Sequence, residues 1–324
     1  MAAFPWHAIV KVLNMSTHDP NQRALLSLHG LAVGDALGGF FEFAGRNAVQ
    51  RIATRWLPSA PWHWTDDTQM AGALVATLVQ KHGIDQDYLA AELARRYERK
   101  RGYGLATRAL LSRIRQGAAW QPEAAGVFAG QGSFGNGAAA RVPPLGAYFA
   151  DDLAAAAAHA ARSAVVTHTH PEAQAGAMAV AVLAALAWQQ RGQPVERAEV
   201  IDRVLAFVAP SIVREQLLVA RDLPAATTAV DAAARLGNGS QVAVQDTVPF
   251  AIWCAATMPD DYEAAIWLAL SGLGDCDTIA AIVGGIIVLR TGLDGIPPTW
   301  LAACEPLPET GASRGTESGE NQLD

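Results

Sequence analysis

Long apolar, alanine-rich segments limit what this chain can fold into. The longest uncharged apolar run is AGAMAVAVLAALAW, from Ala175 to Trp188. Alanine has the highest helix propensity, and a chain that is poor in β-branched runs favours packed helices. Apolar positions recur three and four residues apart, and no series of alternating apolar and polar residues predicts strands. We therefore predict an all-α protein, folded as a single compact orthogonal helical domain.

The ends of the chain differ in composition from its middle. Residues 1–20 have the character of an N-terminal arm. Residues 21–305 carry the helical periodicity and form the predicted domain. Residues 306–324 are polar and rich in Gly and Ser, which predicts a disordered tail.

Charge and cysteine content exclude several classes of protein. The net charge is −7, from 24 basic and 31 acidic residues, and the absence of a basic block argues against nucleic acid as a partner. The run from Ala175 to Trp188 is shorter than the ~20 residues that cross a bilayer, so we expect a buried core helix and no membrane contact. Cys254, Cys276 and Cys304 are too widely spaced for a disulfide framework. A reducing, cytoplasmic location fits them best.

Two acidic clusters stand out, and each precedes an apolar helical run. The first is WTDDTQ at residues 64–69, and the second is GDCDT at residues 274–278. Taken alone, each cluster is consistent with a helix N-cap, because the free N–H groups and the dipole of a helix start favour acids. The backbone at a helix entrance is also partly extended, so that neighbouring carboxylates can converge there. Both interpretations stay open.

If the two clusters meet in space, their carboxylates repel one another strongly. Hard oxygen ligands in this number suit Mg²⁺ or Mn²⁺. Zinc is disfavoured, because the chain has no Cys/His set at suitable spacing. Two ions bridged by shared Asp residues would neutralise the cluster and polarise a water molecule. The metal interpretation of the clusters is therefore a binuclear site at helix N-termini, beside the N-cap interpretation that needs no metal.

A glycine-rich segment and a histidine offer groups for an anionic ligand. Glycine lets the backbone approach a phosphate closely, although such a segment can also be a simple connector. Phe134 could stack on a base or a ribose, or belong to the core. His168, in THTHPE, could donate to a phosphate or ribose oxygen, or act as a cap. The other binding candidates in the segment are Ser133, Gly135, Asn136, Gly137 and Arg141.

Five motifs in this order resemble those of the ADP-ribosylglycohydrolase family. The motifs read GDALGGFFE, WTDDTQM, GSFGNGAAARVPPLG, THTHPEA and GDCDTIAAIVGG, and the resemblance covers roughly residues 23–292. The resemblance implies a compact all-α domain with two divalent cations, Mg²⁺ or Mn²⁺. By motif match, the implied metal ligands are Thr65, Asp66, Asp67, Asp275, Asp277 and Thr278.

The same resemblance implies roles for the remaining site residues. The segment from Ser133 to Arg141 resembles the family's ADP-ribose phosphate loop, with His168 near the ligand and Asp35 behind the metal ligands. Leu273 stands where many members have a glycine. The implied catalytic residues are Asp66, Asp67, Asp277 and Glu42, and only some members share the last of these.

The resemblance implies hydrolysis of the glycosidic bond between ADP-ribose and an acceptor side chain, with arginine favoured. The partner would then be an ADP-ribosylated protein or another ADP-ribose conjugate. Alternatives are a hydrolase of the serine or O-acetyl-ADP-ribose type and a non-catalytic ADP-ribose-binding relative. Paired Asp residues also serve phosphoester cleavage, so a metal-dependent phosphohydrolase is a further alternative.

Overall fold

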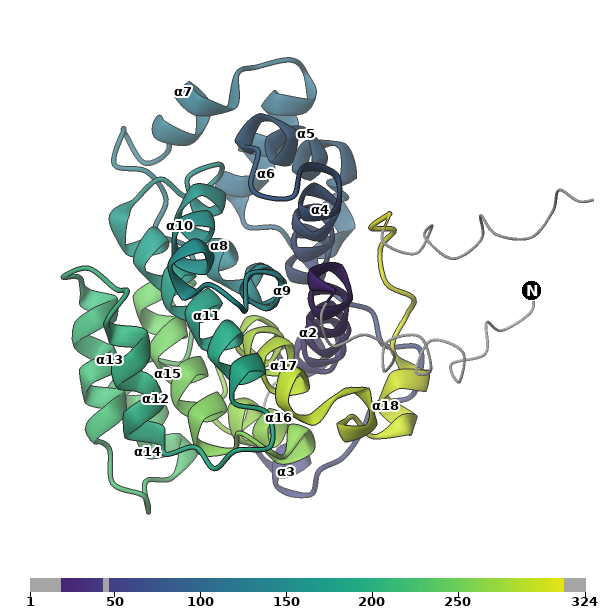
Figure 1. Ribbon diagram of the computed structural model, residues 1–324. Helices are drawn as coiled ribbons and strands as arrows, with labels where there is room; N and C mark the ends of the chain where they lie inside the picture. Colours follow the sequence, from purple (N-terminus) through teal and green to yellow (C-terminus); the bar gives the residue numbers. More distant parts are fainter. Residues whose placement is uncertain (1–18, 43–46, 312–324) are drawn as a thin grey trace, which may run out of the picture.

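The computed structural model describes residues 19–42 and 47–311. Within these residues the regular structure is helical and contains no β-strand, as expected from the sequence (Figure 1). The helices are α2 (Pro20–Glu42), α3 (Ala48–Ala53), α4 (Asp66–Lys81), α5 (Gln86–Arg96), η2 (Arg99–Arg101), α6 (Leu105–Arg115), α7 (Trp120–Ala125), α8 (Gly137–Ala140), α9 (Pro143–Tyr148), α10 (Leu153–Ala164), α11 (Pro171–Gln189), α12 (Arg197–Leu205), α13 (Ile212–Asp222), α14 (Ala229–Leu236), α15 (Val244–Thr257), α16 (Tyr262–Leu270), α17 (Cys276–Thr291), η3 (Leu293–Gly295) and α18 (Pro298–Ala303).

The centre of the protein is the close packing of α2 against α17 (Figure 1). Gly30, Gly34 and Gly38 recur every fourth residue and therefore lie on one face of α2. A β-carbon on Gly34 would clash with the carbonyl oxygen of Ala280, and one on Gly38 would clash with that of Cys276. The three glycines thus let the two helix backbones touch, which places the end of α2 beside the start of α17.

This packing explains why α2 continues through a pair of glycines. The pair Gly38–Gly39 predicts a helix end, yet α2 continues to Glu42. Gly38 is there because the backbone of Cys276 and Asp277 leaves no room for a side chain. The extra turn carries Glu42 to the edge of the candidate site.

The remaining helices surround this pair. In Figure 1, α4 to α7 lie at the top and α12 to α15 at the lower left, with α11 between them. Two helices, α2 and α11, are long and apolar enough to cross a membrane by length and composition. In the fold, 83% of the apolar window of α2 and 72% of that of α11 are buried. Core helices of a soluble protein pass the same test, so these helices are weak evidence for a membrane.

The segment after α18 packs on the helical body. Glu305 N donates to Trp62 O at 2.9 Å, and the indole N–H of Trp64 donates to Pro306 O at 3.1 Å. A β-carbon on Gly72 of α4 would clash with Pro308. Residues 306–311, expected in the tail, therefore lie against α4, whereas residues 312–324 fall outside the described residues, as do residues 1–18 of the expected arm.

We predict that Gly34→Ala lowers the free energy of unfolding by about 1–3 kcal/mol, because overpacking a tight contact forces backbones apart. The matched control is Gly104→Ala, since a β-carbon there meets no atom within 4 Å. Chemical denaturation of both variants measures the difference. Equal stability of the two variants would contradict the packing role of Gly34.

Candidate active site

The first acidic cluster lies at the start of α4, where a buried acid of α2 holds it. Thr65 is the N-cap, and its side chain accepts a hydrogen bond from Asp67 N at 3.4 Å. Asp35 is fully buried, and its carboxylate accepts from Thr65 N at 3.0 and 3.1 Å. The same carboxylate accepts from the backbone N–H and the hydroxyl of Thr68. Asp35 therefore fixes the helix start that presents Asp66 and Asp67.

The second acidic cluster lies at the start of α17. Asp275 is the N-cap residue and Asp277 is in the first turn. The side-chain amide of Asn136 donates to Asp275 Oδ2 at 2.6 Å, which ties the glycine-rich segment to this cluster. Thr278 N donates to Asp277 Oδ1 at 2.8 Å, so the turn itself orients that carboxylate. Two helix N-termini, with their positive dipole ends, thus contribute acids to one region.

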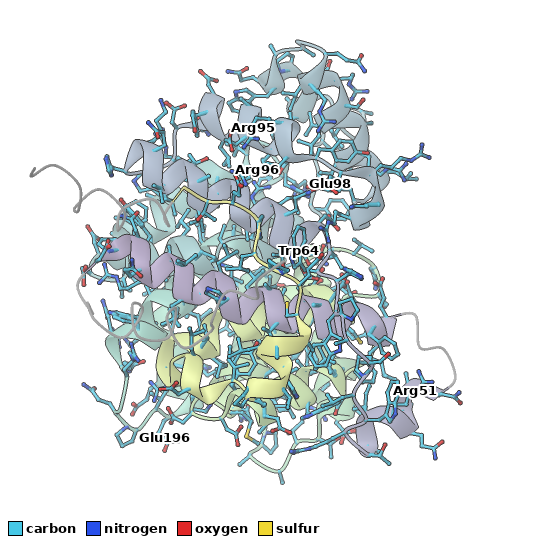
Figure 2. All side chains as sticks on the ribbon, turned by 90° about the vertical axis from the view of Figure 1, so that its right-hand side faces the viewer. Arg51, Trp64, Arg95, Arg96, Glu98 and Glu196 are labelled. Carbon is cyan, nitrogen blue, oxygen red and sulfur yellow. The ribbon has the colours of Figure 1, made fainter. Side chains whose placement is uncertain are left out.

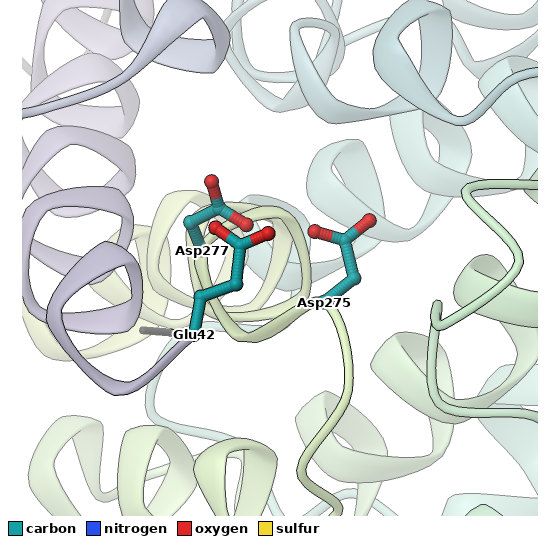
Figure 3. Close-up of side chains that lie close together, drawn as sticks. All are labelled: Glu42, Asp275 and Asp277. Atoms are coloured by element: carbon teal, nitrogen blue, oxygen red, sulfur yellow. The ribbon is translucent and has the colours of Figure 1, made fainter. Parts of the chain in front are cut away.

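The fold brings the two clusters together. The hydroxyl of Thr278 donates to Asp67 Oδ2 at 2.8 Å, although the two residues are 211 positions apart in the sequence. Carboxylate oxygens of Glu42, Asp275 and Asp277 lie within 4.8 Å of one another, a spacing that could hold a metal ion. Figure 3 shows these three side chains turned toward one another from the ends of α2 and α17. A cap-only interpretation of the clusters does not explain this convergence.

Burial and mutual repulsion disfavour the ionised form of the carboxyl groups at the site. Burial, followed by the charge of Asp277, raises the pKa of Asp35 and of Glu42 to about 7. Burial also raises the pKa of Asp66, Asp67 and Asp275 well above the usual range, and neighbouring carboxylates add to the effect. In the described part of the chain, no Lys or Arg forms an ion pair with these groups. An all-oxygen donor set without a protein cation fits hard divalent ions.

A cavity of about 1210 Å³ opens over the clusters. Phe134 is 38% exposed at its wall, and its ring stacks on Phe128 with centroids 6.3 Å apart. The side-chain oxygen of Ser133 accepts from Gly135 N at 3.1 Å, which shapes the glycine segment. The expected site residues that line the cavity are Glu42, Thr65, Asp66, Asp67, Ser133, Phe134, Gly135, Asn136, Gly137, His168, Asp275, Asp277 and Thr278.

Arg141 is placed differently from the sequence-based expectation. The expected contact with a ligand phosphate requires an exposed guanidinium, but Arg141 is fully buried and is not among the residues that line the cavity. Its NH1 donates to Thr167 Oγ1 at 2.9 Å, and its NH2 donates to Ser163 O at 2.6 Å. Arg141 therefore supports the wall of the cavity from behind.

A charged part of the cavity rim was not expected from the sequence. The guanidinium of Arg101 lies 3.3 Å from the ring centroid of Trp64 and pairs with Glu305. Glu305 also accepts from Trp64 N at 3.0 Å and contacts His63 Nδ1 at 3.1 Å. In Figure 2, Trp64 is seen between the blue helices above and the yellow helices below. Only the adjacent DDT motif could have drawn attention to this segment.

A second missed element is the turn between α14 and α15. A β-carbon on Gly239 would clash with the Asp275 side chain, and Asn238 O accepts from Asp275 N at 3.0 Å. The run GNGSQ signals a turn but not a site. Leu273, which stands where a glycine is common in the family, has a φ of +58°. This left-handed conformation is one that glycine adopts without cost.

Comparison with known proteins agrees with this geometry. The sequence profile described as ADP-ribosylglycohydrolase matches residues 16–318. The chain belongs to the ADP-ribosylglycohydrolase family. It is 32% identical to an uncharacterized protein of Archaeoglobus fulgidus, over 84% of this chain and 88% of the relative. It is 27% identical to ADP-ribosylhydrolase ARH3 of Homo sapiens, over 87% and 89% of the two chains.

Two further matches point the same way. The chain is 28% identical to ADP-ribosylarginine hydrolase Tri1 of Pseudomonas putida, over 86% of this chain and 73% of the relative. A solved structure titled ADP-ribosylglycohydrolase-related protein complex aligns with a TM-score of 0.57 and 27% identity, covering 89% of this chain and 93% of that chain. Membership of this family makes the protein a glycohydrolase enzyme.

The strained acids yield a stability prediction for the metal-free protein. A carboxyl group whose pKa is raised in the folded state destabilises the fold when it is ionised. This cost grows as the pH rises from the pKa of the unfolded state to that of the folded state. We expect Asp66→Asn to leave stability unchanged near pH 4, the ordinary Asp value, and to raise it increasingly toward pH 8. Thermal melts of both proteins in EDTA, across this pH range, measure the difference.

The same thermal melts are repeated with a divalent metal ion in place of EDTA. Mg²⁺ or Mn²⁺ should raise the melting temperature of the wild type at pH 8, and raise that of Asp66→Asn much less, because a ligand that binds only the folded state stabilises it. A variant that is less stable than the wild type in EDTA at pH 8 would contradict the repulsion argument.

Proposed function

We propose that this enzyme hydrolyses the glycosidic bond between ADP-ribose and an acceptor side chain, with arginine as the favoured acceptor. The observation that carries the proposal is the convergence of Asp67, Thr278 and the carboxylates of Asp275 and Asp277 at one cavity. The glycine-rich segment and His168 line the same cavity. A volume of about 1210 Å³ is sufficient for a dinucleotide-like ligand.

Two divalent cations complete the proposed site. The residues that would hold them are Thr65, Asp66, Asp67, Asp275, Asp277 and Thr278. Bound there, the ions would act as Lewis acids toward ribose hydroxyls and a water molecule. The donor set favours Mg²⁺ or Mn²⁺, because all the candidate ligand atoms are oxygens.

The chain's own groups then serve the bond cleavage. Glycoside hydrolysis passes through a state with oxocarbenium character, and carboxylates aimed at the reacting carbon stabilise positive charge. Glu42 lies at the cavity with its carboxylate within 4.8 Å of those of Asp275 and Asp277. This position suits proton transfer to or from the reacting water or the leaving acceptor. Phe134 offers an exposed ring at the cavity wall on which a flat group can stack.

Arginine is the favoured acceptor for two reasons. Tri1, with which the chain shares 28% identity, is named an ADP-ribosylarginine hydrolase. In addition, a carboxylate such as that of Glu42 can pair with a guanidinium through two parallel hydrogen bonds. The second candidate is an oxygen-linked acceptor, serine or O-acetyl-ADP-ribose. The position of Glu42 favours this alternative as well, since a carboxyl beside the metal ligands can protonate a leaving oxygen.

A panel of ADP-ribose conjugates tests the proposal. Arginine-linked, serine-linked and O-acetyl substrates are incubated with the protein in Mg²⁺, in Mn²⁺ or in EDTA, and the products are separated by chromatography. We expect free ADP-ribose from the arginine-linked substrate in the presence of metal. Asp66→Asn should lower this rate at least about a hundredfold, since metal catalysis contributes several kcal/mol.

The matched control is Asp231→Asn, because Asp231 is an exposed acid on α14 whose side chain contacts Thr228. It should keep the wild-type rate. Turnover that survives Asp66→Asn would end the proposal, and release of AMP with ribose phosphate would identify a phosphohydrolase instead. ADP-ribose release from the serine-linked or O-acetyl substrate alone would select the second candidate. The cytoplasmic location remains a proposal, supported by three free, buried cysteines.

A further inference from the structure

Arg141 is a buried cation for which the proposed chemistry has no direct use. It is fully buried, and no carboxylate in the described part of the chain forms an ion pair with it. Its guanidinium is instead satisfied by neutral oxygens of Ser163 and Thr167. A buried charge without a counter-ion is costly, so its presence calls for a physical explanation.

The contacts of Arg141 lead directly to His168. Arg141 NH1 donates to Thr167 Oγ1 at 2.9 Å, and Thr167 Oγ1 lies 2.7 Å from His168 Nδ1. Thr167 is 2% exposed and His168 is 4% exposed, so the contact between Thr167 Oγ1 and His168 Nδ1 is shielded from bulk water. The three side chains form a chain of hydrogen bonds from the interior to the wall of the cavity, which His168 lines.

The direction of these hydrogen bonds follows from which groups carry protons to donate. A guanidinium has only donors, so Thr167 Oγ1 must accept from Arg141. The hydroxyl keeps one proton, and its other hydrogen-bonded partner among the described residues is His168 Nδ1. The opposite arrangement, with the proton on Nδ1, would leave a buried hydroxyl proton without an acceptor. The usual cost of such a group disfavours that arrangement by roughly a factor of ten or more.

The imidazole is neutral, so the proton position matters. Burial, together with the charge of Arg141, lowers the pKa of His168 to about 3. A neutral ring carries one proton, and when Nδ1 accepts, Nε2 must carry it. The Nε2 edge of the ring lies beside the glycine segment, where a β-carbon on Gly135 would be 3.1 Å from Nε2. The absence of that β-carbon lets the ring edge reach the cavity.

We propose that Arg141 is a positioning residue that acts through Thr167 to hold His168 in the Nε2–H tautomer, so that the ring presents an N–H donor to an oxygen of ADP-ribose. This inference rests on the proposed function for the identity of the ligand. It assigns to Arg141 and Thr167 a role in orienting a hydrogen-bond donor rather than a contact with the ligand. A positive charge suits this role, because it both fixes the hydroxyl and keeps the ring neutral.

The first test is the ¹⁵N NMR spectrum of the histidine rings in the ligand-free wild type, with the His168 signals assigned from a His168→Gln variant. We expect Nδ1 in the non-protonated range and Nε2 in the protonated range. A ring that carries its proton on Nδ1 would overturn the inference.

The second test compares Thr167→Val with Thr167→Ser. Valine removes the hydroxyl, so we expect His168 to populate both tautomers and the Kd for ADP-ribose, measured by calorimetry, to rise about tenfold, ~1.4 kcal/mol. Serine restores the hydroxyl and should restore the wild-type ring spectrum. The matched control is Thr77→Val, which removes a buried hydroxyl bonded to Ala73 O in α4 and should leave the His168 spectrum unchanged.

The outcomes separate the two proposals. If Thr167→Val retains the single Nε2–H tautomer and the wild-type Kd, Arg141 and Thr167 serve packing alone and the inference is wrong. If the wild type fails to bind ADP-ribose, the proposed function and the ligand half of the inference fail together. The ring spectrum tests the tautomer of His168 without any ligand. It can be measured on the wild type even if Thr167→Val does not fold.

Discussion

The close contact between α2 and α17 is the constraint on which the site depends. Gly34 and Gly38 let the backbone of α2 touch that of Ala280 and Cys276, where any side chain would clash. Because helices are rigid rods, this contact fixes the positions of groups several turns away. The end of α2 therefore delivers Glu42 to the start of α17. The glycines of α2 and the acidic cluster at the start of α17 are thus two parts of one arrangement.

The ionised carboxyl groups around the cavity destabilise the metal-free protein. Several carboxylates lie at or near one cavity, and burial raises the pKa of Asp35, Asp66 and Asp67 because their charged forms lose water. The fold tolerates them partly because the N-termini of α4 and α17 both favour negative charge. The remaining repulsion is what a pair of divalent ions would relieve. Function and metal-dependent stability are therefore expected to change together when an acid is removed.

The acids that line the cavity were singled out from the sequence, whereas some residues around them were placed differently from the expectation. The position of Asp66 and Asp67 at a helix start follows from local rules, since an N-cap before an apolar helix can be recognised from a few neighbouring residues. Arg141 was misplaced because a glycine-rich context looks exposed, whereas its guanidinium turns inward toward Thr167. Leu273, which replaces a common family glycine, has a left-handed φ that the sequence did not predict. The rim formed by Arg101 and Glu305 joins segments 204 positions apart, and no local pattern encodes such a pair.

By itself, the sequence determined the all-α class, the helix starts at the two acidic clusters and the family resemblance, because periodicity and capping act over a few residues. Only the tertiary structure decided that Asp67 meets Thr278, that α2 runs on to Glu42 and that Arg141 lies behind His168. These juxtapositions depend on which side chains fit between closely packed helices. That fit is a property of the whole core rather than of any segment of the chain.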